Sequence, residues 1–346
     1  MNFDVAIVGS GPAGATCAAL CAQAGLKTAL IERTQFPREK VCGDCLNPAC
    51  WPIFKRLDLE TRILALPHSR LEEVEFIAQH GASIRVPLAR QARGEIAIKR
   101  SLLDQLLLTR AGELGAAVFQ NHTVTKIDPG WILHTTGGSF SGKIVVAADG
   151  RNSTVARLLN LLPASARDRI GLQTHLSAPA NFGSRVALHF LKEGYCGAAS
   201  IGDGELNLCL VSRPRDLDAL KTWALNHFQI AADPQWRTIS PLSRAPIAAR
   251  NGNLLLIGDA ARVVEPFTGE GIYYALSTGE LAARHIVDNT LDAYPKAHAA
   301  LYRGRLWINE ISRFAVTHPR VATAILATAR VTPGILRFLT RKVIGS

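Results

Sequence analysis

The sequence predicts an α/β fold: a parallel sheet flanked by helices, a second β-rich unit inserted into that arrangement, and a helical segment at the end. Three observations lead to this prediction. A strand, a glycine turn, a helix and a second strand follow one another within the first 32 residues. Two later apolar runs each end in an aspartate beside a glycine, as buried strands do at a ligand-binding edge. Between them lie short alternating runs that are typical of half-buried strands.

The composition is that of an ordinary globular chain. Its 346 residues correspond to one large domain or two interleaved ones. With 48% hydrophobic and 19% charged residues it can bury a sizeable core, and nothing indicates disorder. We expect no cleaved signal, because residues 1–9 lack a basic stretch, and no membrane span, because no run of about 18 uncharged apolar residues occurs. Seven cysteines, an odd number, favour a reducing cytoplasm over a disulfide framework.

The first motif is the glycine turn G-S-G-P-A-G that follows the first strand. Gly9 permits the turn, Gly11 lets a pyrophosphate approach the backbone, and Gly14 lets helix and strand pack closely. The phosphates would meet the free N–H groups and the positive dipole end of the helix. The second strand ends at Glu32, whose carboxylate can accept hydrogen bonds from an adenosine ribose. These features predict a bound dinucleotide.

The second motif is the Asp-Gly end of a later strand. Residues 143–157 read as a buried strand that ends in Asp149-Gly150 and leads into a helix capped by Asn152 or Ser153. A carboxylate at the end of a strand can hold the hydroxyl groups of a sugar or ribityl chain.

The third motif combines a Gly-Asp strand end with a glycine turn. Residues 253–261 read as a buried strand that ends in Gly258-Asp259. The turn P-F-T-G-E-G-I at 266–272 then opens a helix that runs to about residue 285. Its backbone N–H groups and dipole would stabilise negative charge on a reduced flavin.

Together, in this order, the three motifs resemble the FAD-binding superfamily of aromatic hydroxylases and geranylgeranyl reductases. The resemblance covers most of the first 290 residues. It implies a Rossmann-like FAD-binding domain with an inserted β-sheet substrate domain and a C-terminal helical segment. The FAD-binding residues that it implies are Gly9, Gly11, Ala13, Gly14, Glu32, Arg33, Arg100, Asp149, Gly150, Gly258, Asp259, Pro266, Gly269, Gly271 and Ile272.

The motifs also suggest where the units begin and end. We expect a discontinuous FAD-binding domain over 1–70, 96–160 and 245–295, a substrate domain over 71–95 and 161–244, and the C-terminal helical segment over 296–346. No second G-x-G-x-x-G occurs, so we expect no dedicated nicotinamide domain. An external reductant such as NAD(P)H would bind transiently.

The segment KVCGDCLNPACWP, residues 40–52, holds three cysteines. Its C-x4-C pair, Cys45 and Cys50, resembles the redox pair of flavoprotein disulfide reductases, but Ala49 stands where that family has glycine. A zinc site is not expected, because no second pair or histidine cluster follows at the required spacing. The segment is more similar to the geranylgeranyl reductase group, in which a Lys-x-Cys-Gly loop lies beside the flavin ring. That resemblance implies Cys42 as the active-site-loop cysteine and Gly43 as the point of close approach.

Two interpretations of Cys42 stay open: a thiol that donates a proton to carbon after hydride transfer, and a small buried apolar residue. The same family carries an aromatic-rich Tyr-x-Trp-x-Phe-Pro strand in its substrate domain. Here Tyr195 fits, and the small residues Cys196-Gly197-Ala198 replace the bulky part. The resemblance implies Tyr195 as a substrate residue, and the departure from the family pattern predicts a pocket that is roomier than usual or differently shaped.

These observations favour an FAD-dependent oxidoreductase that reduces C=C bonds of a lipid-like or isoprenoid substrate, a hydrophobic small molecule, by hydride transfer. The alternative is a flavin monooxygenase that hydroxylates an aromatic or polyketide substrate, since that chemistry belongs mainly to the cofactor. Two lesser alternatives are a disulfide reductase that uses Cys45 and Cys50 and a non-enzymatic binder of prenylated proteins.

The net charge of +11 bears on partners. We expect no nucleic acid, because no finger spacing or aromatic-rich basic motif occurs. Residues 311–346 contain six Arg or Lys residues and no acidic residue. Two interpretations stay open: helices packed on the body, and a surface that binds anionic lipid and places a cytoplasmic protein at the inner face of a membrane.

Overall fold

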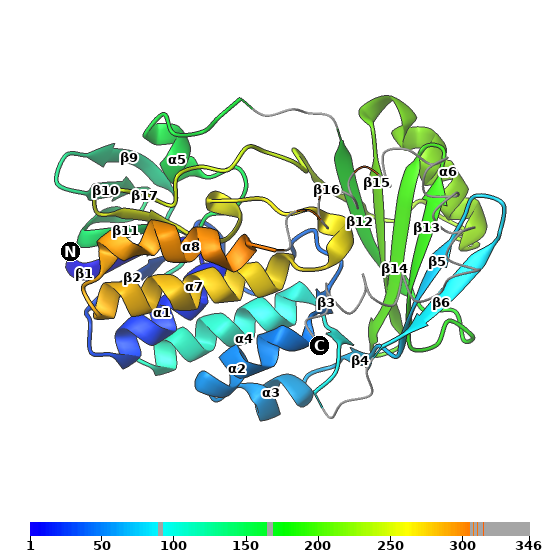
Figure 1. The fold of residues 1–346 in the computed structure, drawn as a ribbon, viewed down its shortest axis with the longest axis horizontal. Helices are drawn as coiled ribbons and strands as arrows, with labels where there is room; N and C mark the ends of the chain where they lie inside the picture. Colours follow the sequence, from blue (N-terminus) through cyan, green and yellow to red (C-terminus); the bar gives the residue numbers. More distant parts are fainter. Residues whose placement is uncertain (89–92, 165–168, 305–306, 308–309, 311–313, 315–346) are drawn as a thin grey trace.

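The computed structural model describes residues 1–88, 93–164, 169–304, 307, 310 and 314. Figure 1 shows two units side by side: helices stacked over a largely parallel sheet, and an antiparallel sheet at the other end of the molecule. The predicted α/β class, with a Rossmann-like sheet and a separate β-sheet, is confirmed.

The first sheet has eight strands, with β17-β18-β11-β1-β2-β8 in spatial order and β10 and β9 at the side of β11. The central pairs β1–β2, β1–β11, β11–β18 and β2–β8 are parallel, as expected for strands that are linked by crossover helices. Its strands are β1 (Asn2–Val8), β2 (Thr28–Ile31), β8 (Ala117–Phe119), β9 (Val124–Asp128), β10 (Ile132–Thr135), β11 (Gly138–Ala147), β17 (Arg250–Asn251) and β18 (Leu254–Leu256).

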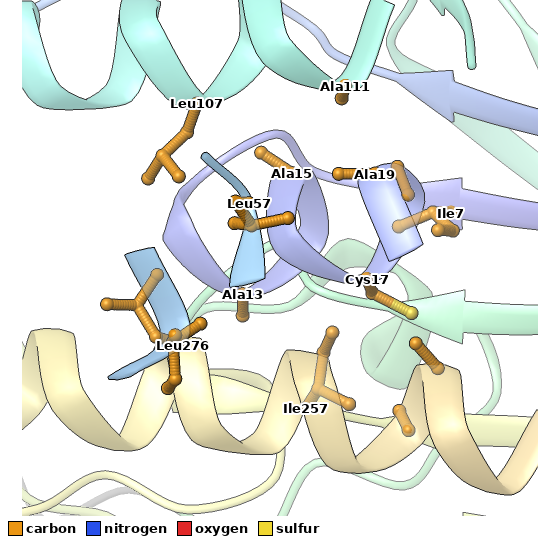
Figure 2. Packing of buried hydrophobic residues seen from close by; sticks show 14 of the residues in the cluster. Ile7, Ala13, Ala15, Cys17, Ala19, Leu57, Leu107, Ala111, Ile257 and Leu276 are labelled. Atoms are coloured by element: carbon orange, nitrogen blue, oxygen red, sulfur yellow. The ribbon is translucent and has the colours of Figure 1, made fainter. Parts of the chain in front are cut away.

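The helices of this unit gather around α1. Figure 2 shows α1 between α4 and α7, with Ala15, Cys17 and Ala19 filling the narrow spaces around it. Small side chains allow three helices to approach closely, and all three of these are buried. The helices are α1 (Pro12–Gln23), α2 (Trp51–Arg56), α3 (Glu60–Leu64), α4 (Arg100–Glu113), α5 (Thr154–Leu158), α7 (Gly271–Val287) and α8 (Tyr294–Tyr302).

The second sheet has seven strands in the order β16-β12-β15-β14-β13-β5-β6. Helix α6 (Leu217–His227) covers its outer face, where Leu220 and Ala224 join a buried apolar cluster (Figure 1). The opposite face looks toward the first unit. The strands are β5 (Glu73–Ile77), β6 (Ser83–Pro87), β12 (Ile170–Ser177), β13 (Arg185–Leu191), β14 (Gly194–Gly202), β15 (Glu205–Ser212) and β16 (Arg237–Ile239).

Short elements connect the two units. A three-stranded sheet of β3 (Cys45–Leu46), β7 (Ile96–Ala97) and β4 (Ser69–Arg70) lies between them. Single turns of 3-10 helix occur at η1 (Pro48–Cys50), η2 (Pro214–Asp216), η3 (Gly258–Ala260), η4 (Pro266–Thr268) and η5 (Leu291–Ala293). The loop that precedes β3 carries the Cys42-Gly43 segment to the boundary between the units.

Most of the predicted C-terminal helical segment, including the basic stretch 311–346 apart from one position, lies outside the described residues, and so does its predicted contact with anionic lipid. Helix α8 is its described part. No helix in the described ranges is long and apolar enough to cross a membrane.

Candidate functional site

A cavity of about 360 Å³ lies between the two units. It begins at the first turn of α1, passes the strand ends of the parallel sheet and the turn before α7, and ends against the inner face of the second sheet. The predicted site residues that line it are Gly11, Ala13, Cys42, Gly43, Arg100, Gly150, Tyr195, Gly258, Asp259, Pro266, Gly269, Gly271 and Ile272. Gly9, Gly14, Glu32, Arg33 and Asp149 do not line it.

The glycines of the first turn divide into two kinds. A Cβ on Gly14 would lie 1.8 Å from the carbonyl oxygen of Gly9. Gly9 has a φ of +99°, and a Cβ added to it would lie 2.6 Å from the carbonyl oxygen of Ala148. Packing of helix on strand therefore requires these two glycines. Gly11 differs, because only Nη2 of Arg38 lies within 4 Å of its would-be Cβ. Its open side faces the cavity, where a phosphate could approach the backbone.

The start of α1 is suited to an anion. No side chain caps the helix, and Pro12 occupies its first position. The N–H groups of the first turn have no acceptor within the helix, and they add to the positive end of the dipole. Arg38 brings a guanidinium next to this turn. The arrangement fits a pyrophosphate.

Glu32 is placed where the sequence predicted it, directly after β2, and its carboxylate is already engaged. Ser10 donates to Oε2 from its N–H at 3.0 Å and its hydroxyl at 2.8 Å, and Thr34 donates to Oε1 at 3.0 and 2.8 Å. Burial would raise the pKa of Glu32, but these bonds and the charge of Arg38 lower it below its usual value. A ribose would have to share the carboxylate with these hydroxyl groups, so the ribose contact stays a prediction. The neighbouring Arg33 is exposed.

The Asp-Gly motif also differs in detail from the expectation. Asp149 Oδ2 accepts hydrogen bonds from the N–H groups of Thr154 (2.6 Å) and Val155 (3.1 Å), so this carboxylate stabilises the start of α5. Ser153 is the N-cap, as one of the two predicted alternatives had it, and it accepts from the Ala156 N–H at 3.0 Å. Only the Gly150 half of the motif reaches the cavity wall.

The Gly-Asp motif puts a carboxylate on the wall. Asp259 Oδ2 accepts from Arg151 Nη2 at 3.0 Å, and Arg244 Nη2 donates to the Asp259 main-chain oxygen at 2.6 Å. The two arginines hold this strand end in position while leaving Asp259 in the cavity lining. The placement is compatible with the predicted contact to ribityl hydroxyls.

The turn before α7 is open on the cavity side. Nothing lies within 4 Å of a Cβ added to Gly269 or Gly271, and Gly269 has a φ of +69°. No side chain caps α7, whose first turn therefore presents N–H groups. A buried bidentate ion pair between Arg169 and Glu265, at 3.0 and 2.8 Å, fixes the residue before Pro266. A flat ring could thus lie against the backbone of this turn.

Basic and acidic residues share the polar part of the wall, and the sequence predicted a role for only one of the basic ones. Arg100 is buried and makes a bidentate pair with Asp104 at 2.8 Å for both bonds. Lys40 lines the cavity nearby, and burial, followed by repulsion from Arg100, lowers its pKa to about 8. Lys40 and Arg38 escaped notice because a basic residue in a loop is usually solvated; the Lys-x-Cys-Gly spacing was the available signal.

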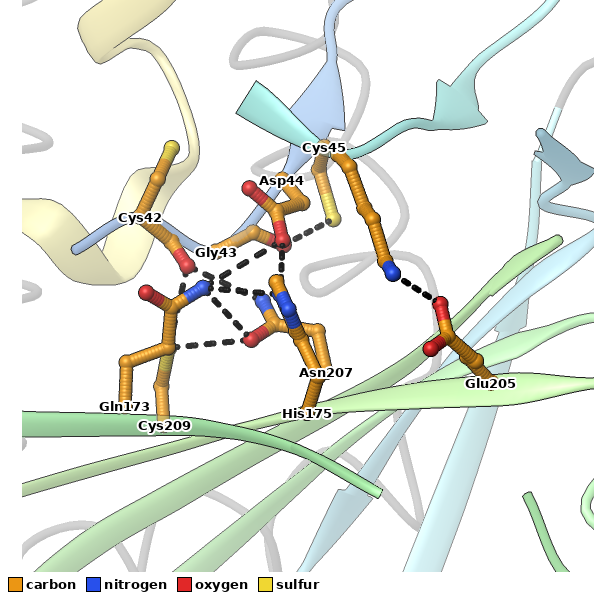
Figure 3. Close-up of polar contacts among 10 residues, drawn as sticks. Cys42, Gly43, Asp44, Cys45, Gln173, His175, Glu205, Asn207 and Cys209 are labelled. Carbon is orange, nitrogen blue, oxygen red and sulfur yellow. Dashed lines mark hydrogen bonds and ion pairs between the residues drawn. The ribbon is translucent and has the colours of Figure 1, made fainter. Parts of the chain in front are cut away.

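The Cys42-Gly43 loop is attached to the second sheet through its backbone (Figure 3). The Cys42 carbonyl oxygen accepts from Asn207 Nδ2 at 2.9 Å and from Cys209 Sγ at 3.2 Å. The Cys42 sulfur points away from this network. Burial raises the pKa of the Cys42 thiol, and the charge of Arg100 opposes the rise.

Cys45 and Cys50 are both free thiols, and they lie in different surroundings. Cys45 donates to the Gly43 carbonyl oxygen at 3.3 Å, whereas Cys50 is 1% exposed in the core of the first unit. Burial raises the pKa of both thiols. The C-x4-C spacing therefore gains no support as a redox pair. No group of three or more metal-ligating side chains occurs among the described residues.

The far wall is the inner face of the second sheet, and it is largely apolar. Tyr195 is buried, and its ring meets the ring of Phe267 edge-on at 5.5 Å between centroids. The small residue Gly197 follows on the same strand and lines the cavity. The other apolar residues of this wall are Val74, Phe76, Leu172, Val186, Leu188, Phe190, Ala198, Ala199, Leu210, Val211, Ile239 and Leu242.

A scan against protein families matches residues 2–181 to the FAD binding domain family. Among curated proteins, the chain is 27% identical over 337 residues to menaquinone reductase of Mycolicibacterium smegmatis, covering 86% of this chain and 80% of the relative. It is 29% identical over 315 residues to geranylgeranyl diphosphate reductase of Rhodobacter capsulatus, covering 82% and 74%.

Solved structures show the same fold. A flavin-dependent brominase superposes with a TM-score of 0.80 at 21% identity, covering 98% of this chain and 94% of the other. A geranylgeranyl bacteriochlorophyll reductase-like protein of Thermoplasma acidophilum gives 0.76 at 21% identity, covering 91% and 88%. The family match spans more than half of the chain and includes the uncapped start of α1, the open side of Gly11 and the basic residues Lys40 and Arg100 of the cavity wall. The chain therefore belongs to the FAD-binding domain family and is an FAD-dependent oxidoreductase.

Proposed function

We propose that this flavoprotein reduces C=C bonds of an isoprenoid or similarly lipid-like substrate. The observation that carries the proposal is the cavity itself: one wall holds the FAD features, and the facing wall is an apolar sheet surface. An apolar chamber next to the flavin position suits a hydrocarbon chain and excludes water from the reacting bond.

The relatives support the same substrate class. Menaquinone reductase and geranylgeranyl diphosphate reductase, by name, act on molecules that carry isoprenoid chains. The alignments cover 86% and 82% of this chain and 80% and 74% of the two relatives. Because the aligned lengths exceed the FAD-binding part, the similarity includes the part of the chain that would bind substrate. We therefore propose that this chain also reduces an isoprenoid substrate.

When bound, FAD supplies the hydride for such a reduction. The residues of this chain would hold and surround it. Gly11 and the first turn of α1 take the pyrophosphate, Asp259 meets the ribityl chain, and the Gly269 turn lies against the ring. Cys42 and Gly43 form the wall beside the ring, and Tyr195 contacts the substrate.

The test is anaerobic reduction of the FAD-loaded protein, followed by separate exposure to geranylgeranyl diphosphate, to a short-chain menaquinone and to O2. We expect flavin reoxidation with an alkene and a saturated product identified by mass spectrometry. Substrate-stimulated O2 consumption with a hydroxylated product would instead establish the monooxygenase alternative. A colourless protein that takes up no FAD would remove both.

A further inference from the structure

A buried carboxyl–imidazole pair borders the cavity beside the Cys42-Gly43 loop, and neither member belongs to the predicted FAD site. Asp44 is fully buried and lines the cavity, and its Oδ2 lies 2.9 Å from Nε2 of His175 on β12. Its other oxygen, Oδ1, is buried without a hydrogen-bond partner among the described residues. Figure 3 shows Oδ1 directed away from the network that holds Oδ2. Such an unpaired buried oxygen is costly, so it calls for a role beyond folding.

The surroundings act on the pKa of this carboxyl in opposite directions, and the net shift is upward. Burial raises the pKa of Asp44, while the hydrogen bond with His175 and the charge of Arg100 oppose the rise. The groups that face Asp44 come from α4, β12, β15 and its own loop: Arg100, His175, Cys42, Cys45 and Cys209. His175 and Arg100 are the basic groups among them, and Arg100 is already paired with Asp104.

The network gives Asp44 a route to water. Gln173 Nε2 lies 3.3 Å from Asp44 Oδ2 and 2.9 Å from Asn207 Oδ1, so the carboxyl is held in one orientation. The side chain of His175 keeps 10% of its surface exposed, whereas that of Asp44 keeps none. The imidazole thus connects the buried acid with the solvent.

Resting on the proposed function, we propose that Asp44 and His175 form a proton-delivery pair for the reduction. Saturation of a C=C bond breaks the π bond and forms two C–H bonds, one from a hydride and one from a proton. Reduced FAD supplies the hydride with its two electrons and ends oxidised. The Asp44 carboxyl gives its proton to the second carbon, and a proton that comes from water by way of His175 restores the carboxyl.

Asp44 is better suited to this role than Cys42. Both line the cavity, but a carboxyl is intrinsically a stronger acid than a thiol, with ordinary pKa values of about 3.9 and about 8.5. Burial raises both pKa values, so the carboxyl moves toward the range in which an acid works best at neutral pH and the thiol moves away from it. The thiol also lacks a connection to an imidazole in Figure 3.

The chain allows a clean substitution and a matched control. Asp44 has a φ of +58°, a conformation that asparagine tolerates, and the amide oxygen of Asp44→Asn can still accept from His175. The variant therefore keeps the geometry and loses the proton. Asp128 and His134 form a second pair at 2.7 Å on the outside of the first sheet, remote from the cavity lining. Asp128→Asn is the control.

The kinetic test uses the full chain loaded with FAD, reduced anaerobically with dithionite and mixed with geranylgeranyl diphosphate or a short-chain menaquinone. Asp44→Asn should slow flavin reoxidation on the order of a hundredfold or more. His175→Ala should slow it as well and recover with added imidazole, and Asp128→Asn should match the wild type. A wild-type rate in Asp44→Asn overturns the pair, as does a loss confined to Cys42→Ser.

A second measurement does not depend on turnover. Infrared pH titration of the full chain should show the C=O band of a buried protonated carboxyl in the wild type and in Asp128→Asn, and its loss in Asp44→Asn. A wild type without that band overturns the proposal. A wild type that reduces neither probe refutes the proposed function and the delivery role with it. A wild type that reduces a probe no faster than Asp44→Asn refutes the pair alone.

Discussion

Gly11 and Gly14 lie three residues apart in one turn, and the structure predicts different consequences when each receives a methyl group. A Cβ on Gly14 would lie 1.8 Å from the Gly9 carbonyl oxygen, where real Cβ atoms come no closer than 3.0 Å. Helix α1 would have to move by at least 1.2 Å from the end of β1. Overpacking of this kind costs about 1–3 kcal/mol, and α1 is also packed between α4 and α7. Gly14→Ala should lower the free energy of unfolding by about 3 kcal/mol.

Gly11→Ala should leave the fold intact. Its φ of −68° suits any residue, and the new Cβ would meet only Arg38 Nη2 at 3.8 Å. We expect a change in the free energy of unfolding within about 0.5 kcal/mol. The methyl group would occupy the space through which a pyrophosphate reaches the helix. A clash worth about 1–3 kcal/mol corresponds to an FAD dissociation constant raised about tenfold to a hundredfold.

The assay pairs urea unfolding of the FAD-free protein, followed by circular dichroism, with FAD titration followed by flavin fluorescence. Gly112→Ala in α4 is the control, because its Cβ would meet only Val118 at 3.8 Å. That helix position should gain up to about 1 kcal/mol from alanine. Normal stability in Gly14→Ala would refute the packing argument. Normal FAD affinity in Gly11→Ala would refute the assignment of the pyrophosphate to this turn.

Three further predictions concern Lys40 and Gly197 of the cavity wall and the buried ion pair that precedes Pro266. Folding lowers the pKa of Lys40 from 10.5 to about 8, so the unfolded chain binds more protons than the folded one between these pH values. The free energy of unfolding of the FAD-free protein should therefore rise with pH across that window, and Lys40→Met should remove this rise. Arg169→Ala should lower the free energy of unfolding in urea by about 3–5 kcal/mol, because Glu265 would stay charged and buried. Arg62→Ala is the control: its partner Glu113 is exposed, so the loss should be under about 1 kcal/mol. Gly197→Phe should keep the flavin spectrum and lower turnover of geranylgeranyl diphosphate more than that of a shorter prenyl diphosphate, because the ring would enter the apolar chamber.

Local features of the fold could be predicted because they depend on neighbours in the sequence. The glycine turn after β1, the acid directly after β2 and the cap at Ser153 appear where the motifs indicated. The short alternating runs expected between the second and third motifs include β13 and β15. Periodicity and caps carry that information over a few residues.

The roles of individual carboxylates were harder to predict. Glu32 and Asp149 occupy the predicted strand ends, yet one carboxylate accepts from Ser10 and Thr34 and the other from the N–H groups that begin α5. A carboxylate at the end of a strand can accept hydrogen bonds from nearby backbone N–H groups and hydroxyls or from a ligand. The motif does not show which of these donors lies nearer to the carboxylate. Only the geometry separates Asp259, which stays on the cavity wall, from these two.

The Asp44 network shows what sheet register adds to a sequence pattern. Gln173 and His175 are two residues apart on β12, and in the antiparallel register they stand opposite Cys209 and Asn207 on β15. Because side chains alternate along a strand, all four project from the same face of the sheet. That face meets the loop of Asp44, which is 131 residues away from His175 in the chain. The sequence shows these polar residues at alternate positions of two strands. Only the pairing of β12 with β15 converts them into one network around a buried acid, and therefore into a reaction that can be tested.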